Sequence, residues 1–396
     1  MKKEFIVPGF KANGIACGIK KNGTEDLALL YSVVPSVVAG VFTKNSFKAA
    51  PVVLDMMRIK NNLCQAIVIN SGNANAATGE EGLHDAYTIT KEVATALGIE
   101  ESLVLVASTG VIGERLPIEK IKGSIGRLIS GLTEKGIKKA AKAIMTTDKF
   151  PKIAFCQERI GGNEITLCGI AKGAGMICPD MATMLAFFMT DVQIEQEVLH
   201  RLFHQVVNDS FNAISVDGCM STNDMAIIVA NGVAKNKTLT KGDKRMRIFK
   251  EMLLYCAKQL AEFIVRDGEG ATKIIEVTVS GAEKLGEAKK IAMAIANSNL
   301  VKTAVFGGDP NWGRIISAVG SSGVKIETKK VKLYIEDMLV FAEDKRKDVE
   351  PKRLHDVMSQ EKIKIFVDLG KGKKVFSVLA SDLTYDYIKI NAHYHT

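Results

Sequence analysis

The sequence predicts an α/β protein whose sheets are covered by helices. Apolar runs rich in Val, Ile and Leu alternate along the whole chain with segments of helical periodicity. The composition, 47% apolar and 24% charged among 396 residues, excludes a disordered chain, a collagen-like repeat and a small disulfide scaffold. No internal repeat and no low-complexity linker interrupts the alternation, and the length predicts two or three domains.

The N-terminal part is predicted to alternate strands with helices. The strands are expected at Leu27–Phe42, Pro51–Asp55, Ala66–Ile69 and Leu103–Ala107, and the helices at Glu80–Leu97 and Lys135–Met145. The strands are aliphatic, and most are bounded by Gly, Asn or Ser. Leu27–Phe42 is the longest nearly apolar stretch, but Pro35 and Gly40 within it indicate two strands and a turn rather than a membrane span.

The middle of the chain carries the clearest strand signals. Lys152–Glu158 and Glu164–Ala171 are predicted to pair as a hairpin through the turn Gly161–Asn163. Met184–Met189 is continuously apolar, as expected of a strand buried on both faces. Glu195–Val207 has the periodicity of an amphipathic helix.

The C-terminal part continues the alternation after a long helix expected at Asp243–Val265. Further strands are predicted at Ile274–Val279, Val301–Phe306, Lys330–Ile335, Lys362–Leu369 and Lys374–Leu379, with a helix at Lys284–Ala296. We expect a soft domain boundary near Lys284.

Charge and cysteine usage narrow the function classes. The net charge is +9, but the lysines are dispersed and aromatic residues make up only 6%, so a nucleic-acid partner is not expected. None of the seven cysteines forms a Cys-x2-Cys pair, which is typical of reduced thiols in a cytosolic protein. Glu4, Pro8 and Lys11 interrupt any apolar signal-peptide core, so we expect a cytoplasmic protein without a membrane anchor.

Several common binding-site and catalytic-site motifs are incomplete in this sequence. Gly131-x4-Gly136 lacks the lysine of a phosphate loop, and Gly173-x-Gly175 lacks the third glycine of a dinucleotide fingerprint. His200-x3-His204 has ligand-like spacing, but Arg201 stands where a zinc protease needs Glu, and two ligands do not close a metal site. These histidines are expected on a solvent-facing side of their helix, and no metal is expected.

The most unusual segment runs from Gly169 to Leu185. A strand ends in a glycine-rich turn, Pro179-Asp180 makes a second turn, and the small residue Ala182 precedes Thr183, which opens an apolar strand. By composition alone, this pattern indicates only a β-turn in front of a strand.

This segment closely resembles the self-processing site of the ornithine acetyltransferase family, the glutamate N-acetyltransferases of arginine biosynthesis. Further segments resemble the family in order along nearly the whole chain: Gly40–Thr43, Asn70–Asn75, Ser108–Gly113, Thr146–Asp148, Ser215–Gly218, Asp267–Gly270, Gly308–Arg314 and Asn391–Thr396. One position departs from the family form, because Asp180 stands where Asn is usual.

The resemblance implies a helix–sheet–sheet–helix sandwich like that of N-terminal nucleophile enzymes, with a smaller C-terminal α/β domain. It also implies that the chain cuts itself between Ala182 and Thr183, giving an α chain of residues 1–182 and a β chain of residues 183–396. Two copies of each chain would form a heterotetramer.

Thr183 would then be the nucleophile. An α-amine has a reference pKa of about 8, against about 10.4 for lysine, so it takes a proton from its own hydroxyl near neutral pH. Thr109 and Gly110 match the oxyanion-hole pair of the family, which supplies the hydrogen-bond donors that acyl transfer needs.

The resemblance implies ping-pong transfer of the acetyl group of N-acetylornithine to glutamate, with acetyl-CoA as a further donor if the enzyme is bifunctional, and with no cofactor. The matching substrate-binding residues are Thr146, Lys172, Thr183, Glu269, Asn391 and Thr396. Two alternatives remain open: a self-processing amidohydrolase or aminopeptidase that uses water as the acceptor, and a non-catalytic binding protein that retains the fold.

Overall fold

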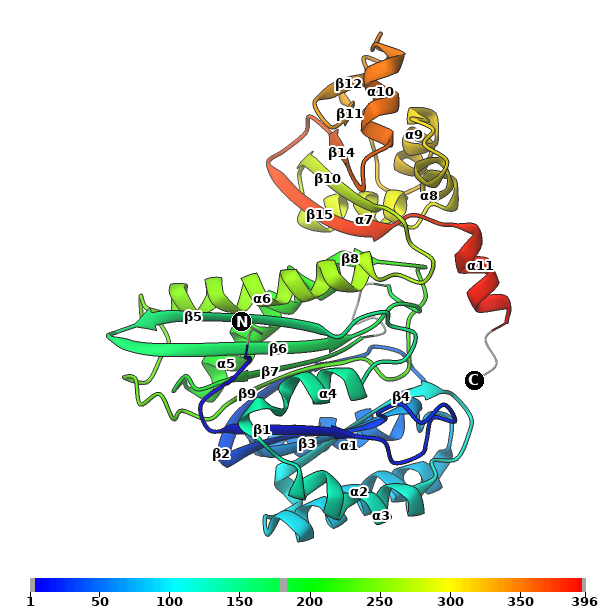
Figure 1. Ribbon diagram of the computed structural model, residues 1–396. Helices are drawn as coiled ribbons and strands as arrows, with labels where there is room; N and C mark the ends of the chain where they lie inside the picture. The colour runs from blue at the N-terminus through cyan, green and yellow to red at the C-terminus, as the bar shows by residue number, and fades with distance from the viewer. Residues whose placement is uncertain (1–3, 179–183, 394–396) are drawn as a thin grey trace.

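The computed structural model describes residues 4–178 and 184–393. Its first sheet has eight strands in the order β4-β3-β2-β9-β7-β6-β5, with β1 paired to β2. These strands are β1 (Phe10–Ile15), β2 (Leu27–Phe42), β3 (Leu63–Asn73), β4 (Val104–Val111), β5 (Lys152–Ile160), β6 (Asn163–Lys172), β7 (Leu185–Thr190) and β9 (Met225–Ala230). Strand β2 pairs with β1 and β3 through its first half and with β9 through its second half, so the sheet folds over on itself (Figure 1).

Helices cover both outer faces of the folded sheet. Helices α2 (Gly79–Leu97) and α3 (Ile118–Ser130) pack outside the half that contains β1–β4. Helices α5 (Gln196–Asn208) and α6 (Met246–Arg266) pack outside the half that contains β5, β6, β7 and β9. Apolar side chains from both halves, together with α4 (Ile137–Ala143), fill the space between them. The predicted helix–sheet–sheet–helix sandwich is confirmed, and its two layers are halves of one hydrogen-bonded sheet.

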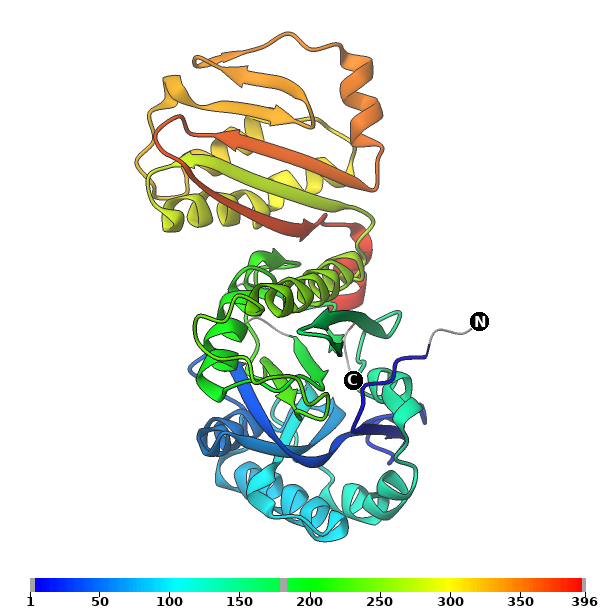
Figure 2. The same cartoon turned by 90° about the vertical axis from the view of Figure 1, so that its left-hand side faces the viewer.

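A second, smaller α/β region stands on the first, as Figures 1 and 2 show. Its sheet has the order β13-β12-β11-β14-β10-β15-β8. The strands are β8 (Ile214–Ser215), β10 (Ile274–Ala282), β11 (Lys332–Ile335), β12 (Met338–Ala342), β13 (Lys345–Arg346), β14 (Lys362–Asp368) and β15 (Lys374–Ser381), and the helices are α7 (Leu285–Ala296), α8 (Asn299–Phe306), α9 (Trp312–Gly320) and α10 (Pro351–Met358). Lys284, near which a boundary was expected, lies between β10 and α7.

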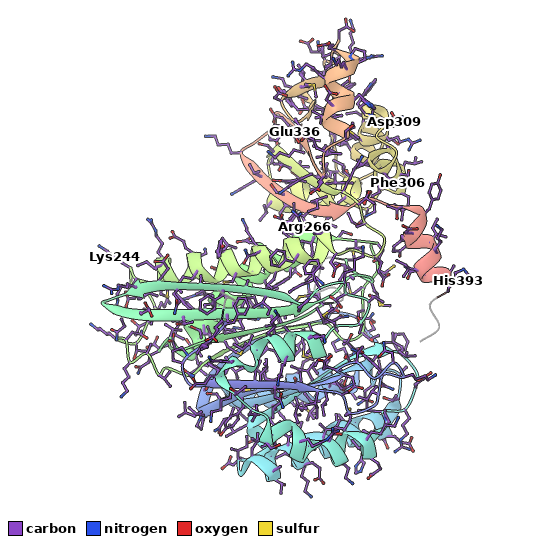
Figure 3. The ribbon with its side chains drawn as sticks, in the orientation of Figure 1. Lys244, Arg266, Phe306, Asp309, Glu336 and His393 are labelled. Carbon is purple, nitrogen blue, oxygen red and sulfur yellow. The ribbon has the colours of Figure 1, made fainter. Side chains whose placement is uncertain are left out.

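The chain passes from α6 of the first region directly to β10 of the second, and two further elements tie the regions together. Strand β8 comes from the part of the chain between α5 and α6, yet it pairs in parallel with β15 of the second sheet. Helix α11 (Tyr385–Ala392) follows β15 and runs back alongside the first region (Figure 1). In Figure 3, Arg266 marks the end of α6 beneath the second sheet, and His393 marks the far end of α11. The second region therefore returns the C-terminal segment to the first.

The hairpin and the buried strand predicted in the middle of the chain are confirmed. Ile160 pairs with Asn163, so Gly161 and Gly162 form a two-residue turn, and both have positive φ, of 61° and 92°. Every residue of β7 is buried. The stretch expected as two strands and a turn is the single strand β2, whose register shifts between Tyr31 and Ser36.

Two predicted strands are wrong, because both segments are helices. Pro51–Asp55 lies in α1 (Ala50–Arg58), where proline in the first turn costs no hydrogen bond. Val301–Phe306 lies in α8, whose N-cap Ser298 accepts from the Val301 N–H at 3.3 Å. Short buried apolar runs do not distinguish a strand from a helix by periodicity. The sequence prediction also missed the helices α3, α9, α10 and α11 and the strands β1, β8, β9, β12 and β13.

Candidate active site

A cavity of about 140 Å³ brings together six residues that the sequence analysis singled out. They are Thr109, Gly110, Thr146, Lys172, Glu269 and Asn391. Three further predicted residues, Ala182, Thr183 and Thr396, lie outside the described residues, as does Asp180. The six come from widely separated parts of the chain, and residues from both halves of the first sheet and from α11 line one space.

Thr109 and Gly110 lie near the end of β4, where it runs parallel to β3. Gly110 has φ +139°, and a Cβ there would stand 2.2 Å from the Gly72 carbonyl carbon. A side chain at position 110 would therefore push β3 and β4 apart. Glycine is required for the close approach of these two strands beside the cavity.

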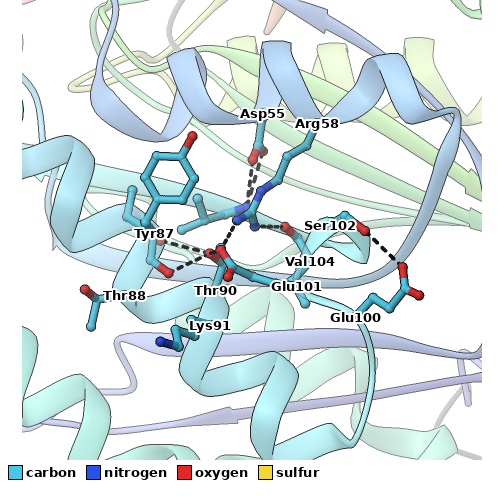
Figure 4. A network of polar contacts seen from close by, with 12 residues as sticks. Asp55, Arg58, Tyr87, Thr88, Thr90, Lys91, Glu100, Glu101, Ser102 and Val104 are labelled. Carbon is cyan, nitrogen blue, oxygen red and sulfur yellow. Dashed lines mark hydrogen bonds and ion pairs between the residues drawn. The ribbon is translucent and has the colours of Figure 1, made fainter.

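Helix α1 holds the beginning of the same strand. The Asp55 carboxylate accepts from the Val106 N–H at 3.0 Å, and Arg58 Nη1 donates to the Val104 carbonyl at 2.6 Å. Arg58 also pairs with Glu101, as Figure 4 shows. Burial raises the pKa of Asp55 well above its usual value. These contacts fix β4 at one end, so Thr109 and Gly110 are presented from a rigid strand at the other.

Lys172, the last residue of β6, is buried in the cavity wall. Its Nζ donates to Thr109 Oγ1 at 3.2 Å. Burial lowers the pKa of Lys172, and the charge of Lys152 acts in the same direction. Three carboxyl groups oppose that shift: Asp148, Asp224 and Glu269. The ammonium group thus has little solvent and is stabilised by nearby carboxyl groups, and it lines the cavity, where it is the cation that could pair with a carboxylate of a ligand.

Glu269 and Asn391 are in direct contact in the cavity lining. Asn391 Nδ2, on α11, donates to Glu269 Oε2 at 2.9 Å. The Glu269 N–H donates to the Ala174 carbonyl at 2.8 Å, and a Cβ at Gly175 would stand 2.3 Å from a Glu269 carboxylate oxygen. The glycine-rich turn after β6 therefore leaves room for the Glu269 carboxylate.

Asn223 lines the cavity and was not identified from the sequence. Its Nδ2 donates to the carbonyls of Ala74 at 2.6 Å and Ser108 at 2.8 Å, so it ties the exits of β3 and β4 to the entry of β9. The sequence feature that could have identified Asn223 is the polar run Ser221–Asp224, which directly precedes the apolar run of β9. It was overlooked because β9 itself was not predicted.

Asp217 and Asp224 contact the described residues on either side of the gap between residues 178 and 184. The Asp217 carboxylate accepts from the N–H groups of Met176 at 2.6 Å and Ile177 at 2.9 Å, and from the Tyr387 hydroxyl of α11 at 3.3 Å. Asp224 is fully buried, burial raises its pKa well above its usual value, and its Oδ2 has no hydrogen-bond partner. Both carboxyl groups are thereby placed near residues 176 and 184.

Neither a metal site nor a membrane-spanning helix is found in residues 4–178 and 184–393. No group of three or more His, Cys, Asp or Glu side chains there is arranged to hold a metal ion. The two rings of His200 and His204 lie 4.4 Å apart on α5, with His200 exposed and His204 half-buried. Among the helices described, none combines the length and apolar character that crossing a bilayer requires.

Comparisons with known proteins agree with one another. Residues 11–396 match the model of the ArgJ family. The chain is 49% identical over 395 residues to "Arginine biosynthesis bifunctional protein ArgJ" of Geobacter sulfurreducens, covering 98% of this chain and all of that relative. It is 47% identical over 392 residues to the protein of the same description from Caldanaerobacter subterraneus, covering 98% and 97%. The crystal structure of the ArgJ protein of Bacillus halodurans matches with a TM-score of 0.51 and 39% identity, over 52% of this chain and 98% of that one.

Proposed function

This chain belongs to the ArgJ family, and we propose that it transfers the acetyl group of N-acetylornithine to glutamate through an acetyl ester on Thr183. Acetyl transfer in arginine biosynthesis is the activity of the family. One observation supports the assignment most directly: a single cavity is lined by Thr109, Gly110, Lys172 and Glu269. These side chains and the backbone N–H of residue 110 are the donors, cation and anion that such a transfer needs.

The enzyme first makes its own nucleophile. The Thr183 hydroxyl attacks the carbonyl carbon of Ala182, the acyl group moves from nitrogen to oxygen, and water hydrolyses the resulting ester. This releases the carboxyl group of Ala182 and the α-amine of Thr183. The α-amine then accepts the hydroxyl proton of its own residue, so no histidine is needed as the base.

Transfer then proceeds in two half-reactions. Thr183 Oγ attacks the acetyl carbonyl of N-acetylornithine, the amide bond breaks, and ornithine leaves with the proton that the α-amine held. The amine of glutamate next attacks the acetyl ester and restores the free hydroxyl. In both steps the Gly110 N–H and the Thr109 hydroxyl donate to the oxyanion. Because Thr109 Oγ1 accepts from Lys172 Nζ at 3.2 Å, its own proton is free to point at the substrate.

Substrate recognition follows from the charges of the cavity. The Lys172 ammonium binds the α-carboxylate that N-acetylornithine and glutamate share. Glu269, oriented by Asn391 Nδ2 at 2.9 Å, binds the side-chain ammonium of ornithine. Thr146 and Thr396 complete the contacts. The cycle uses no metal and no organic cofactor. Acetyl-CoA is proposed as a second acetyl donor, and the processed chains as a cytoplasmic heterotetramer of two α and two β chains.

Intact mass under denaturing conditions tests the nucleophile. Wild-type protein should give two chains, residues 1–182 and 183–396, and Thr183→Ala should stay whole. Thr278→Ala, on the exposed face of β10, is the matched control and should be cut like the wild type. A wild-type protein that remains uncut, or a Thr183→Ala protein that is cut, contradicts the proposal and favours a binding protein that retains the fold.

A transfer assay tests the acceptor. Processed enzyme given N-acetylornithine should form N-acetylglutamate only when glutamate is present, and it should release ornithine in equal amount. Acetate released without any dependence on glutamate would assign the chain to the self-processing hydrolases instead. Glutamate with acetyl-CoA as the only donor tests the second activity, because product above the blank requires the bifunctional cycle.

A further inference from the structure

Lys152, the first residue of β5, is a fully buried cation outside the cavity lining. Its Nζ lies 2.6 Å from Asp148 Oδ1 and 2.6 Å from Asp267 Oδ2, and all three side chains have no exposed surface. An ammonium group in such a place is tolerated only with close anionic partners. A cluster of this kind is a poor source of stability, because apolar packing of equal volume does as well. Its position beside the cavity needs another explanation.

One carboxylate of the cluster binds segments that carry cavity residues, and the other belongs to such a segment. Asp148 accepts from the Thr146 N–H at 2.9 Å and from the Gly173 N–H at 2.7 Å. Gly173 directly follows Lys172, and Asp267 lies two residues before Glu269. Three segments far apart in the sequence, around residues 146, 172 and 269, therefore converge on one ammonium group.

We propose that Lys152 is a positioning residue of the acetyl-transfer site, which holds the segments bearing Thr146, Lys172 and Glu269 at the spacing that the substrate requires. Thr146 and Lys172 are fixed through Asp148, and Glu269 through Asp267. Lys152 touches no substrate itself. This inference rests on the proposed function, because it assigns Lys172 and Glu269 to the two charged ends of the substrate.

The cluster also sets the electrostatic surroundings of Lys172. The charged groups that act on Lys172 are Asp148 and Lys152 beside β5, Asp224 before β9, Glu269 after α6 and Lys20 after β1. Removing the Lys152 charge leaves Asp148 facing Lys172 without its other cation, so Lys172 should keep its proton to higher pH. Asp267 contacts Lys152 rather than Lys172, and removing its charge leaves the Lys152 cation less compensated, so the effect on Lys172 should be the opposite.

Two variants test the inference on the full-length processed enzyme. For Lys152→Met, KM for glutamate should rise by about 10- to 100-fold with a smaller change in kcat, because displaced binding groups weaken capture of the substrate. The alkaline limb of its kcat/KM profile should move to higher pH. Asp267→Asn keeps the Lys152–Asp148 pair and is close to isosteric, and its alkaline limb should move to lower pH. Lys371→Met, at a half-buried lysine that donates to the Lys325 carbonyl in the second region, is the control and should keep both values.

The outcomes separate this inference from the proposed function. A wild-type enzyme without acetyl transfer refutes the proposed function, whatever the variants do. An active wild type, beside variants that lose thermal stability but retain KM and the alkaline limb, overturns the positioning role of Lys152. If Lys152→Met does not fold, the direction of the shift in Asp267→Asn decides, since a limb that is unmoved or moved upward contradicts the proposal.

Discussion

The two regions of the molecule bury charge in different ways. Around the cavity of the first region, Asp148, Lys152, Lys172 and Asp267 are all nearly or fully buried. The core of the second region is a cluster of aliphatic and aromatic side chains between its sheet and α7–α10. Its buried cation, Lys302, does not point into that core: it donates to the carbonyls of Val216 and Ser381 where the two regions meet.

This difference separates stability from chemistry. Burying an ion costs free energy that apolar packing would not cost, so buried charge persists where it performs a task. The second region holds itself together by apolar burial, and among the described residues its contribution to the cavity lining is Asn391 of α11, which it returns to the first region. Substitutions near the cavity of the first region should therefore change kcat or KM, and substitutions in the second region should change the free energy of unfolding.

The largest effect is expected at Thr109. Thr109→Val keeps the shape and the β-branched character of the side chain but removes the hydroxyl donor. The kcat for acetyl transfer should fall by about 10²–10³-fold, the usual loss for one oxyanion donor. The same substitution at Thr278, whose Oγ1 lies 2.8 Å from Ser377 Oγ on the surface of the second sheet, should leave kcat unchanged. Steady-state kinetics of both variants measures these values. An equal kcat for the two variants would contradict the claim that only the first region acts on the chemistry.

A smaller effect is expected from the pH dependence of stability at Lys302. Burial lowers the pKa of Lys302 to about 8, whereas the unfolded chain has the ordinary value of 10.5. Between these values the folded protein binds fewer protons than the unfolded chain, so the free energy of unfolding rises with pH. From pH 7 to 9.5 the wild type should gain about 2 kcal/mol relative to Lys302→Met.

Urea unfolding of both proteins at the two pH values measures this gain. Lys371→Met serves as the control and should show the pH dependence of the wild type. Lys371 pairs with Glu327, whose side chain is half exposed, whereas Lys302 is buried against backbone carbonyls. A parallel pH dependence in the wild type and Lys302→Met would mean that folding does not change the pKa of Lys302.

A loss of about 0.5–1.5 kcal/mol is expected when one methylene is removed from the second core. Ile365 is 1% exposed in the middle of β14, between Val277 of β10 and Ile335 of β11. Ile365→Val should lower the free energy of unfolding by this amount and leave kcat and KM unchanged. Val375→Ala, at a half-exposed position of β15, should change neither. A fall in kcat without a loss of stability would show that the second core communicates with the cavity.

The comparison also shows how far the sequence predicts this protein. The alternation of apolar runs and helical periodicity predicts an α/β protein with helix-covered sheets. The family resemblance implies the sandwich and names residues that the structure brings to one cavity. The errors at Pro51–Asp55 and Val301–Phe306 arise because an apolar run of five or six residues is too short for its period to distinguish a strand from a helix. The Lys152 cluster escapes sequence reasoning for a different reason. Lys152 and Asp267 are 115 residues apart, and only tertiary packing brings them into contact.

The smallest effect is expected at the surface of the second region. Arg353 Nη2 lies 3.2 Å from Asp337 Oδ2, and both side chains are more than half exposed. Solvent screens such a pair, so Arg353→Gln should shift Tm by less than about 1 °C and have no effect on acetyl transfer. Lys152→Met also removes a paired cation, but Lys152 and its partners are fully buried. This substitution should therefore change both Tm and acetyl transfer. Thermal unfolding of the two variants at low and high salt makes the comparison. If the Arg353 variant loses as much as the Lys152 variant, then depth of burial does not decide what an ion pair contributes in this fold.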